Sequence, residues 1–191
     1  MLVRNNKRGE KAVVNLFKSL NIELLEDTPK RYLKMLTELT EYQNISNKKI
    51  AEMVNKIFPI NNKTNSKNMV IVKDIEVFSL CEHHIALMYD MKISVAYIPN
   101  NFVLGLSKIV RTSEMVCKRL QLQERIGNDI LEVMKILTKS EDIAIHIKAK
   151  HSCVTARGIK NGSAETITTN FSGVFSDKDE IKTSFLNSLK T

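Results

Sequence analysis

The sequence predicts an α+β fold in which N-terminal helices precede an antiparallel sheet. In the first third of the chain, apolar residues recur at helical spacing. After residue 65 they alternate with polar residues, which is the period of a half-buried strand. Two helical segments then interrupt the alternating ones. We therefore expect the sheet to be built as a strand pair, a helix pair and a second strand pair.

Three helices are predicted within residues 1–65. Val13 and Phe17 belong to the apolar face of the first helix. The second helix opens at Asp27-Thr28-Pro29, because a proline in the first turn loses no hydrogen bond. The third covers residues 47–58 and is followed by Pro59 and an Asn-rich run at residues 61–65. That run is the predicted linker between an N-terminal helical region, residues 1–65, and a catalytic domain, residues 66–191.

The predicted strands of the second region place its histidines and cysteines. Alternation over residues 143–153 puts His151 and Cys153 together on the apolar face and His146 on the polar face, so we exclude His146 from the site. Cys117 lies within a predicted helix as a packed core thiol. The other predicted segments are strands near residues 74–81, 91–97, 102–106 and 167–171, and helices near residues 107–119, 123–137 and 177–189.

Composition limits the possible partners. The 191 residues carry a net charge of +8, but the basic residues are spread along the chain and aromatic residues make up only 6%. This pattern does not indicate nucleic-acid binding, whereas a phosphorylated small molecule fits the charge. No apolar run approaches membrane-spanning length, and the charged N-terminus does not resemble a secretory signal. Three cysteines are an odd number and are expected as reduced thiols, so the predicted location is the cytoplasm.

Two short segments hold most of the residues that can bind a metal. Cys81-Glu82-His83-His84 and His151-Ser152-Cys153 contain two of the three cysteines and three of the four histidines. Thiolate and imidazole are ligands that Zn²⁺ prefers, and a catalytic zinc site has three protein ligands and one open position. Five candidates for three positions leave two side chains to move protons. The spacing does not decide between His83 and His84 as ligand, and the ligand types also allow Fe²⁺ or Mn²⁺.

At these residues the sequence resembles the GTP cyclohydrolase I family. The resemblance implies a tunnelling fold (T-fold) in a toroidal homo-oligomer of stacked pentamers, a decamer with active sites between subunits. It implies the zinc-dependent conversion of GTP and water to 7,8-dihydroneopterin triphosphate and formate, the first step of tetrahydrofolate and pterin synthesis. The matching blocks are Asp27-Thr28-Pro29-Lys30-Arg31, Ser79-Leu80-Cys81-Glu82-His83-His84, Tyr97-Ile98-Pro99, Gly105-Leu106-Ser107-Lys108 with Arg111, Gln121-Leu122-Gln123-Glu124-Arg125, His151-Ser152-Cys153 with Arg157-Gly158, and Gly173-Val174-Phe175.

The resemblance also assigns roles residue by residue. The zinc ligands fall on Cys81, His84 and Cys153. His83 and His151 match the proton-handling histidines, and Ser107 matches a residue near the ribose that helps to shuttle protons. Gln123 and Glu124 match the pair that recognises guanine, where a carboxylate can accept from N1–H and the 2-amino group together. The residues that match the triphosphate-binding set are Lys108, Arg111 and Arg157.

One loop departs from the family pattern. The family continues after Cys-Glu-His-His with Pro-Phe and a Gly, whereas this chain has Ile85-Ala86-Leu87-Met88-Tyr89-Asp90, and Val154 stands in place of a Met. An alternative function is therefore a catalytically silent or repurposed zinc-binding T-fold oligomer. A zinc nucleobase deaminase would need a Cys-x-x-Cys, which the chain lacks. A nucleic-acid-binding zinc module would need four ligands and a clustered basic face.

Overall fold

The computed structural model describes residues 6–59 and 68–190, and it divides the chain into two compact units, Met1–Glu41 and Tyr42–Thr191. The α+β class predicted from the sequence is confirmed. The predicted domain boundary between residues 65 and 66 and the Asn-rich run at residues 61–65 lie outside the described residues. A search of the described part of the chain finds no helix long and apolar enough to cross a membrane.

The first unit contains two helices, α1 (Lys7–Ser19) and α2 (Thr28–Leu39). The Asn6 side chain caps α1 by accepting from the backbone N–H of Gly9 at 2.9 Å. Pro29 occupies the first turn of α2, as the sequence predicts. The rings of Phe17 and Tyr32 meet edge to face, with their centroids 6.2 Å apart.

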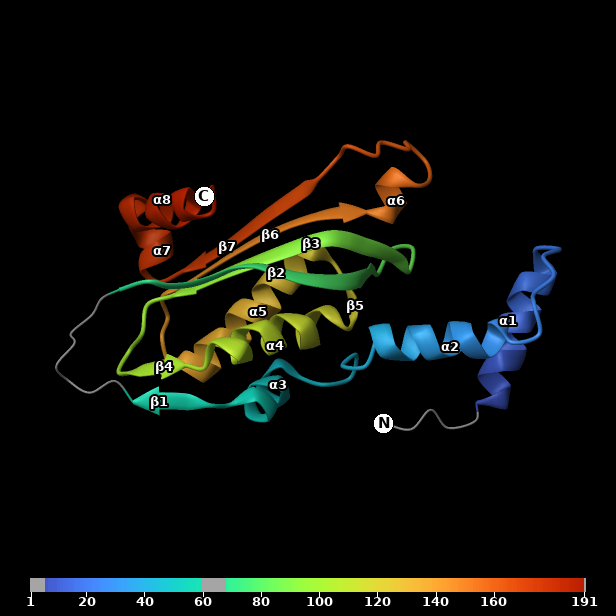
Figure 1. Cartoon of the computed structure of the whole chain (residues 1–191), viewed down its shortest axis with the longest axis horizontal. Helices are drawn as coiled ribbons and strands as arrows, with labels where there is room; N and C mark the ends of the chain where they lie inside the picture. Colours follow the sequence, from blue (N-terminus) through green and yellow to red (C-terminus); the bar gives the residue numbers. More distant parts are fainter. Residues whose placement is uncertain (1–5, 60–67, 191) are drawn as a thin grey trace. The chain divides into compact units, whose positions relative to one another are not determined.

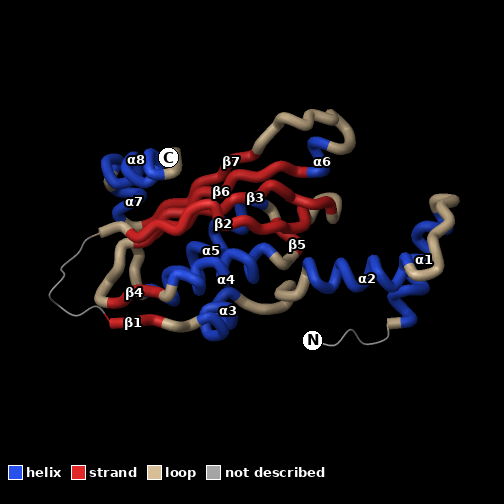
Figure 2. Tube along the Cα trace, viewed as in Figure 1, coloured by secondary structure: helices blue, strands red, loops and turns tan. Residues whose placement is uncertain are grey.

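The second unit is built on a five-stranded sheet with the order β5-β2-β3-β6-β7 (Figure 2). All neighbours are antiparallel except β2 and β5. The strands are β2 (Val70–Cys81), β3 (Ala86–Tyr97), β5 (Leu120–Gln121), β6 (Ile143–His151) and β7 (Thr166–Ser172). The strand pair, helix pair and second strand pair expected from the sequence are confirmed.

A smaller two-stranded sheet shows where the predicted third helix is wrong. Helix α3 (Asn47–Val54) ends four residues earlier than expected, and β1 (Ile57–Pro59) follows it. The reason is tertiary, because β1 pairs antiparallel with β4 (Phe102–Leu104). Long-range pairing overrides the local helical pattern here.

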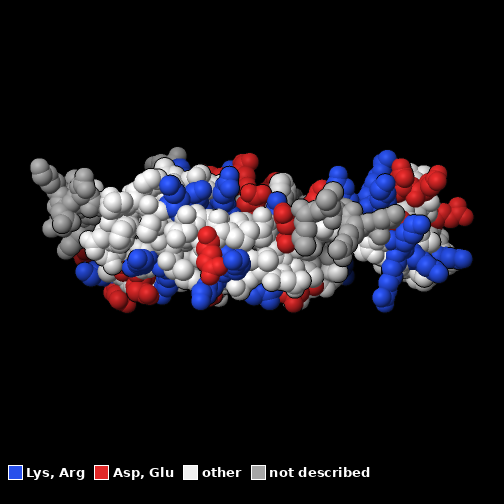
Figure 3. All heavy atoms as spheres, turned by 90° about the horizontal axis from the view of Figure 1, so that it is seen from below, with Lys and Arg blue, Asp and Glu red and all other residues white. Residues whose placement is uncertain are grey.

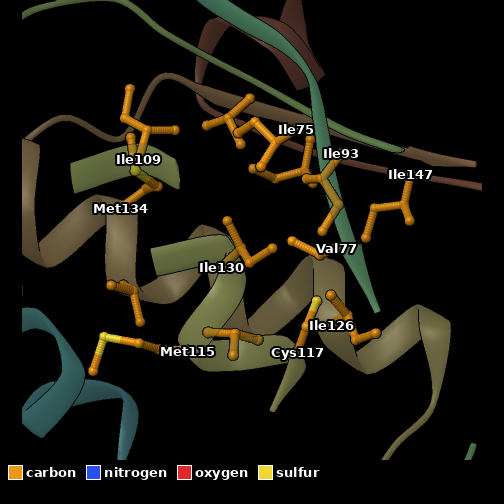
Figure 4. Close-up of a cluster of buried hydrophobic side chains, with 14 of the residues drawn as sticks. Ile75, Val77, Ile93, Ile109, Met115, Cys117, Ile126, Ile130, Met134 and Ile147 are labelled. Carbon is orange, nitrogen blue, oxygen red and sulfur yellow. The ribbon is translucent and has the colours of Figure 1, made fainter. Parts of the chain in front are cut away.

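The helix pair covers one face of the large sheet, as Figure 1 shows. Helices α4 (Leu106–Cys117) and α5 (Gln123–Thr138) pack their apolar sides against β2, β3 and β6. Ile109 and Ile130 of the helices belong to the same core cluster as Ile93 and Ile147 of the strands, and all four are fully buried (Figure 4). Burying each such side chain contributes about 1.5–3 kcal/mol. Cys117 is buried in the same core, as predicted.

Two short helices pack against the opposite face of the sheet at one end. They are α7 (Val174–Asp177) and α8 (Asp179–Ser188), where the sequence predicts one continuous helix. Phe175 and Phe185 from these helices pack against Ala96 and Ala144 of β3 and β6. The remainder of this face carries charged residues and the exposed ring of Phe78.

Positive and negative side chains are interspersed over the surface that the helices form (Figure 3). Among the described residues of the second unit on this face, Lys and Arg alternate with Asp and Glu and form no uniform basic patch of the kind that binds nucleic acid.

The pairing register between β3 and β6 shifts near the end of the sheet that carries Cys81 and His151. Asp90 has φ 48°, and the pairing of β3 with β6 shifts between Tyr89 and Lys92. Asp tolerates the left-handed region better than most residues because its short side chain can bond locally. Asp90 therefore stands in a left-handed conformation at the register shift, and its carboxylate pairs with Lys150 at 3.2 Å.

Candidate active site

The ends of two strands meet where the candidate ligands lie. Met88 of β3 pairs with Ser79 of β2 on one side and with His151 of β6 on the other. Since β2 and β6 both run antiparallel to β3, their C-terminal ends lie at the same end of the sheet. Cys81, His151 and Cys153 each place a potential ligand atom within 4.8 Å of the others. Among the described residues, this is the group of metal-binding side chains that the fold assembles.

Cys153 reaches this group from a helix, and its predicted place in a strand is wrong. Strand β6 ends at His151, and the single-turn helix α6 (Ser152–Thr155) follows. Two hydrogen bonds hold α6 to β3: the Ser152 hydroxyl donates to the Leu87 carbonyl at 2.7 Å, and the Tyr89 hydroxyl donates to Thr155 Oγ1 at 3.0 Å. The sequence pattern assigned no role to Tyr89 or Thr155, since their partners lie some 65 residues away.

A tight turn at residues 82–85 carries the other two histidines. His83 Nδ1 lies 3.9 Å from Cys81 Sγ. His84 is exposed, lies outside the Cys81, His151 and Cys153 group, and has its Nε2 2.9 Å from an Arg157 guanidinium nitrogen, which donates to it. Ile85 closes the turn at φ 51°, a strained conformation for a β-branched residue.

Arg125 anchors this turn to the start of α5. Its guanidinium donates to the Glu82 carboxylate, to the Leu120 carbonyl at 2.8 Å and to Gln121 Oε1 at 2.6 Å. The Glu82 backbone N–H also donates to the Gln121 carbonyl at 2.9 Å. Arg125 stands in one of the matching blocks, but the sequence alone did not suggest this structural role.

Gln123 lies beneath His151. Its side chain is buried, its Oε1 is 2.8 Å from His151 Nε2, and its Nε2 donates to groups on β6 and β7. Glu124, the next residue of α5, is exposed and close enough to His151 to act on its charge. Of the predicted guanine-binding pair, Glu124 is exposed to solvent, whereas the amide of Gln123 makes its hydrogen bonds to other groups of the protein.

The local electrostatics favour neutral side chains at the centre of the site. Burial lowers the pKa of His151, and the Glu124 carboxylate opposes this in part. Burial, and then the neighbouring Cys81, raise the pKa of the Cys153 thiol. A bound dication would reverse the second effect, because metal ions bind thiolates and displace their protons.

The remaining predicted substrate residues are divided between two places. Arg157 lies beside His84. Ser107 and Lys108 lie in the first turn of α4, with Arg111 one turn further. The opposite end of α4 is the one near the cysteines, since the Cys117 carbonyl accepts from Ser79 Oγ at 2.7 Å. Ser107 is therefore about 15 Å from that end along the helix axis. Figure 1 shows α4 starting beside β4, far from α6.

Comparisons with known proteins relate the whole chain to one family. Residues 7–190 match the family model described as GTP cyclohydrolase I. The chain is 51% identical over 165 residues to GTP cyclohydrolase 1 of Clostridium acetobutylicum, covering 86% of this chain and 85% of that protein. It is 52% identical over 155 residues to the protein of the same name from Ruminiclostridium cellulolyticum, covering 80% of each. Among solved structures, the apo form of the archaeosine synthase QueF-Like is 22% identical, with a TM-score of 0.47 over 57% of this chain and 97% of that one.

Proposed function

Because the chain belongs to the GTP cyclohydrolase I family, we propose that it converts GTP and water to 7,8-dihydroneopterin triphosphate and formate. The observation that carries this proposal is the convergence of Cys81, His151 and Cys153 from separate elements, with Gln123 bonded to His151. A silent or repurposed T-fold protein, the alternative, would not need the two further histidines and the exposed Glu124 that surround this group.

The donor set fits a zinc ion. Two cysteine sulfurs and one imidazole nitrogen are a ligand combination of catalytic zinc sites. We propose Cys81, His84 and Cys153 as the ligands, with His151 left for proton transfer. Because His84 and Arg157 are both exposed, their mutual hydrogen bond contributes only about 1 kcal/mol, and a metal can displace it. The free thiols of Cys81 and Cys153 also favour a reducing compartment, so we propose a cytoplasmic location.

The polar residues around the metal group have distinct roles in the proposal. Glu124 accepts from N1–H and the 2-amino group of guanine, and Arg157 holds the triphosphate together with Lys108 and Arg111. The triphosphate is not cleaved, and its binding energy positions the purine. Bound zinc would supply the Lewis acidity that makes water nucleophilic near neutral pH.

Proton transfers complete the reaction. His151 moves a proton between the attacking water and the imidazole ring of guanine, so that the C–N bond at C8 opens and formate leaves after a second hydrolysis. His83 and Ser107 then shuttle protons while the ribose opens, rearranges and recloses as part of the dihydropterin.

The separation of these residues supports an oligomer. The length of α4 keeps Ser107 and Lys108 away from the cysteines of their own subunit. A second subunit can supply them to the site, which is the arrangement expected of a toroidal decamer with sites between subunits.

The proposed function is tested by incubating the purified protein with GTP, following formate release and the absorbance of the dihydropterin. A chelated sample and samples reloaded with Zn²⁺, Fe²⁺ or Mn²⁺ are run beside it. Formation of both products that depends on metal is expected. A protein that binds metal but leaves GTP intact would be the repurposed oligomer.

A further inference from the structure

The amide of Gln123 is one of the few fully buried polar side chains at the site, and its hydrogen bonds are all made within the protein. Its side chain is 1% exposed. The amide nitrogen Nε2 lies 3.3 Å from the Ile147 carbonyl, 3.0 Å from the Thr166 carbonyl and 3.3 Å from Thr168 Oγ1. The amide oxygen Oε1 lies 2.8 Å from His151 Nε2.

These partners fix the direction in which the amide points. Backbone carbonyls accept hydrogen bonds and cannot donate them. If the amide were turned over, Oε1 would face the carbonyls of Ile147 and Thr166. Three buried oxygen acceptors would then face one another without a hydrogen between them, which is unfavourable. The oxygen therefore faces His151, and because an amide oxygen only accepts, the proton between them must belong to His151 Nε2.

We propose that Gln123 is a positioning residue that keeps a proton on Nε2 of His151, so that Nδ1 is the ring nitrogen that exchanges protons at the active site. The inference rests on the proposed function and refines it. A hydrogen bond to the ring nitrogen that faces away from the reacting atoms selects the tautomer and the ring orientation of a catalytic imidazole. It also gives Gln123 a role that does not involve contact with guanine.

This tautomer assigns both proton transfers of His151 to its Nδ1 atom. The Nδ1 lone pair accepts a proton from the attacking water as the oxygen–carbon bond forms at C8. The same Nδ1–H is then given to the guanine ring nitrogen as the C–N bond breaks, so that the imidazole ends neutral. Throughout, Nε2–H stays bonded to Gln123, which prevents the ring from turning over between the two transfers.

The tautomer can be observed by magic-angle-spinning ¹⁵N NMR of the sedimented full-length protein containing ¹⁵N-histidine, at about pH 8 where a neutral histidine is expected. The His151 signals are assigned from their loss in His151→Asn. We expect a single form with hydrogen on Nε2, before and after chelation. In Gln123→Met the form with hydrogen on Nδ1 should appear. Finding Nδ1–H in the unaltered protein, or an unchanged single tautomer in Gln123→Met, would overturn the proposal.

Two matched controls separate positioning from packing and from guanine binding. Thr168→Val removes one partner of the amide nitrogen and should leave the tautomer unchanged. Glu124→Gln, at the exposed neighbour, should weaken GTP binding and also leave the tautomer unchanged. If Gln123→Met does not assemble, the unaltered protein alone decides: hydrogen on Nδ1 of its His151 would contradict the assignment.

Kinetics provide the second readout. Gln123→Met should lower kcat by about tenfold to a hundredfold, the range for loss of a hydrogen bond that orients a functional histidine, while KM for GTP changes by less than about threefold. A large rise in KM with unchanged kcat would instead make Gln123 a guanine-binding residue. Failure of the proposed function is a separate result, because the unaltered protein would then form no formate from GTP.

Discussion

Replacing Gly127 with Ala tests how closely α5 must approach β7. Gly127 is buried on α5, one turn beyond Gln123. A Cβ placed there would lie 1.9 Å from Oδ1 and 2.7 Å from Cγ of Asn170 on β7. The first of these distances is shorter by about 1.5 Å than the 3.4 Å at which ordinary van der Waals contact begins, so either the Asn170 side chain or the helix must move.

Two opposing effects determine the size of the change. Alanine is favoured over glycine within a helix by up to about 1 kcal/mol. Overpacking a buried contact costs about 1–3 kcal/mol. We expect the free energy of unfolding to fall by about 1–2 kcal/mol. A displaced α5 would also move Gln123 away from His151, so kcat should fall with stability.

The assay is urea unfolding at one fixed protein concentration, because an oligomer's stability depends on concentration. Asn170→Ala is the matched variant. Among the described residues, the buried Oδ1 of Asn170 has no hydrogen-bond partner, and Nδ2 of Asn170 donates only to the exposed Asn128 side chain. Gly127→Ala combined with Asn170→Ala should be more stable than Gly127→Ala alone by about 1–2 kcal/mol. A single Gly127→Ala variant as stable as the unaltered protein would refute the reasoning.

Four other substitutions test the site and its supports. Cys153→Ser should lose bound metal and GTP turnover together, as measured by metal analysis and formate release, and full activity without metal would exclude the zinc centre. His151→Ala should keep metal and assembly but lose ring opening; loss of its metal would instead make His151 a ligand. Asp90→Ala should lower the free energy of unfolding by about 1 kcal/mol relative to Asp90→Gly, because only glycine adopts φ 48° at little cost, and equal urea midpoints would contradict this. Burial lowers the pKa of His146, an effect that Lys148 assists and Asp74 opposes, so the unfolded chain binds more protons than the folded one near pH 6. The free energy of unfolding should therefore fall as the pH drops below about 6.5. Urea unfolding of chelated protein should show a smaller fall for His146→Gln.

Local patterns in the sequence predicted much of the fold. Pro29 marked the start of α2, and alternation in β2, β3 and β6 marked the buried face of the sheet. The errors occur where a distant segment decides the structure. Residues 57–59 form a strand because β4 lies beside them, and Cys153 leaves the strand because Ser152 bonds to the Leu87 carbonyl. No periodicity within a segment reports a partner elsewhere in the chain.

The candidate site was predictable to a different degree. Ligand chemistry made five residues recognisable as candidates, and the fold brings three of them together, Cys81, His151 and Cys153, while His84 lies outside this group. The sequence could not show that the Gln123 amide points inward, because its partners on β6 and β7 come from 24 to 45 residues further along the chain. Nor could it show that Arg157 contacts His84. Roles that depend on the direction of a side chain require the tertiary structure.

The position of Lys108 at the far end of α4 has a genetic consequence under the proposed assembly. A site made from two subunits can be damaged from either side, so a Cys153→Ser subunit and a Lys108→Ala subunit carry defects that are inactive when each is alone. Co-expressed in one oligomer, they would form some sites that combine the intact halves of both. Two inactive alleles would then complement each other, whereas each defect alone would impair only the sites to which its subunit contributes the altered half.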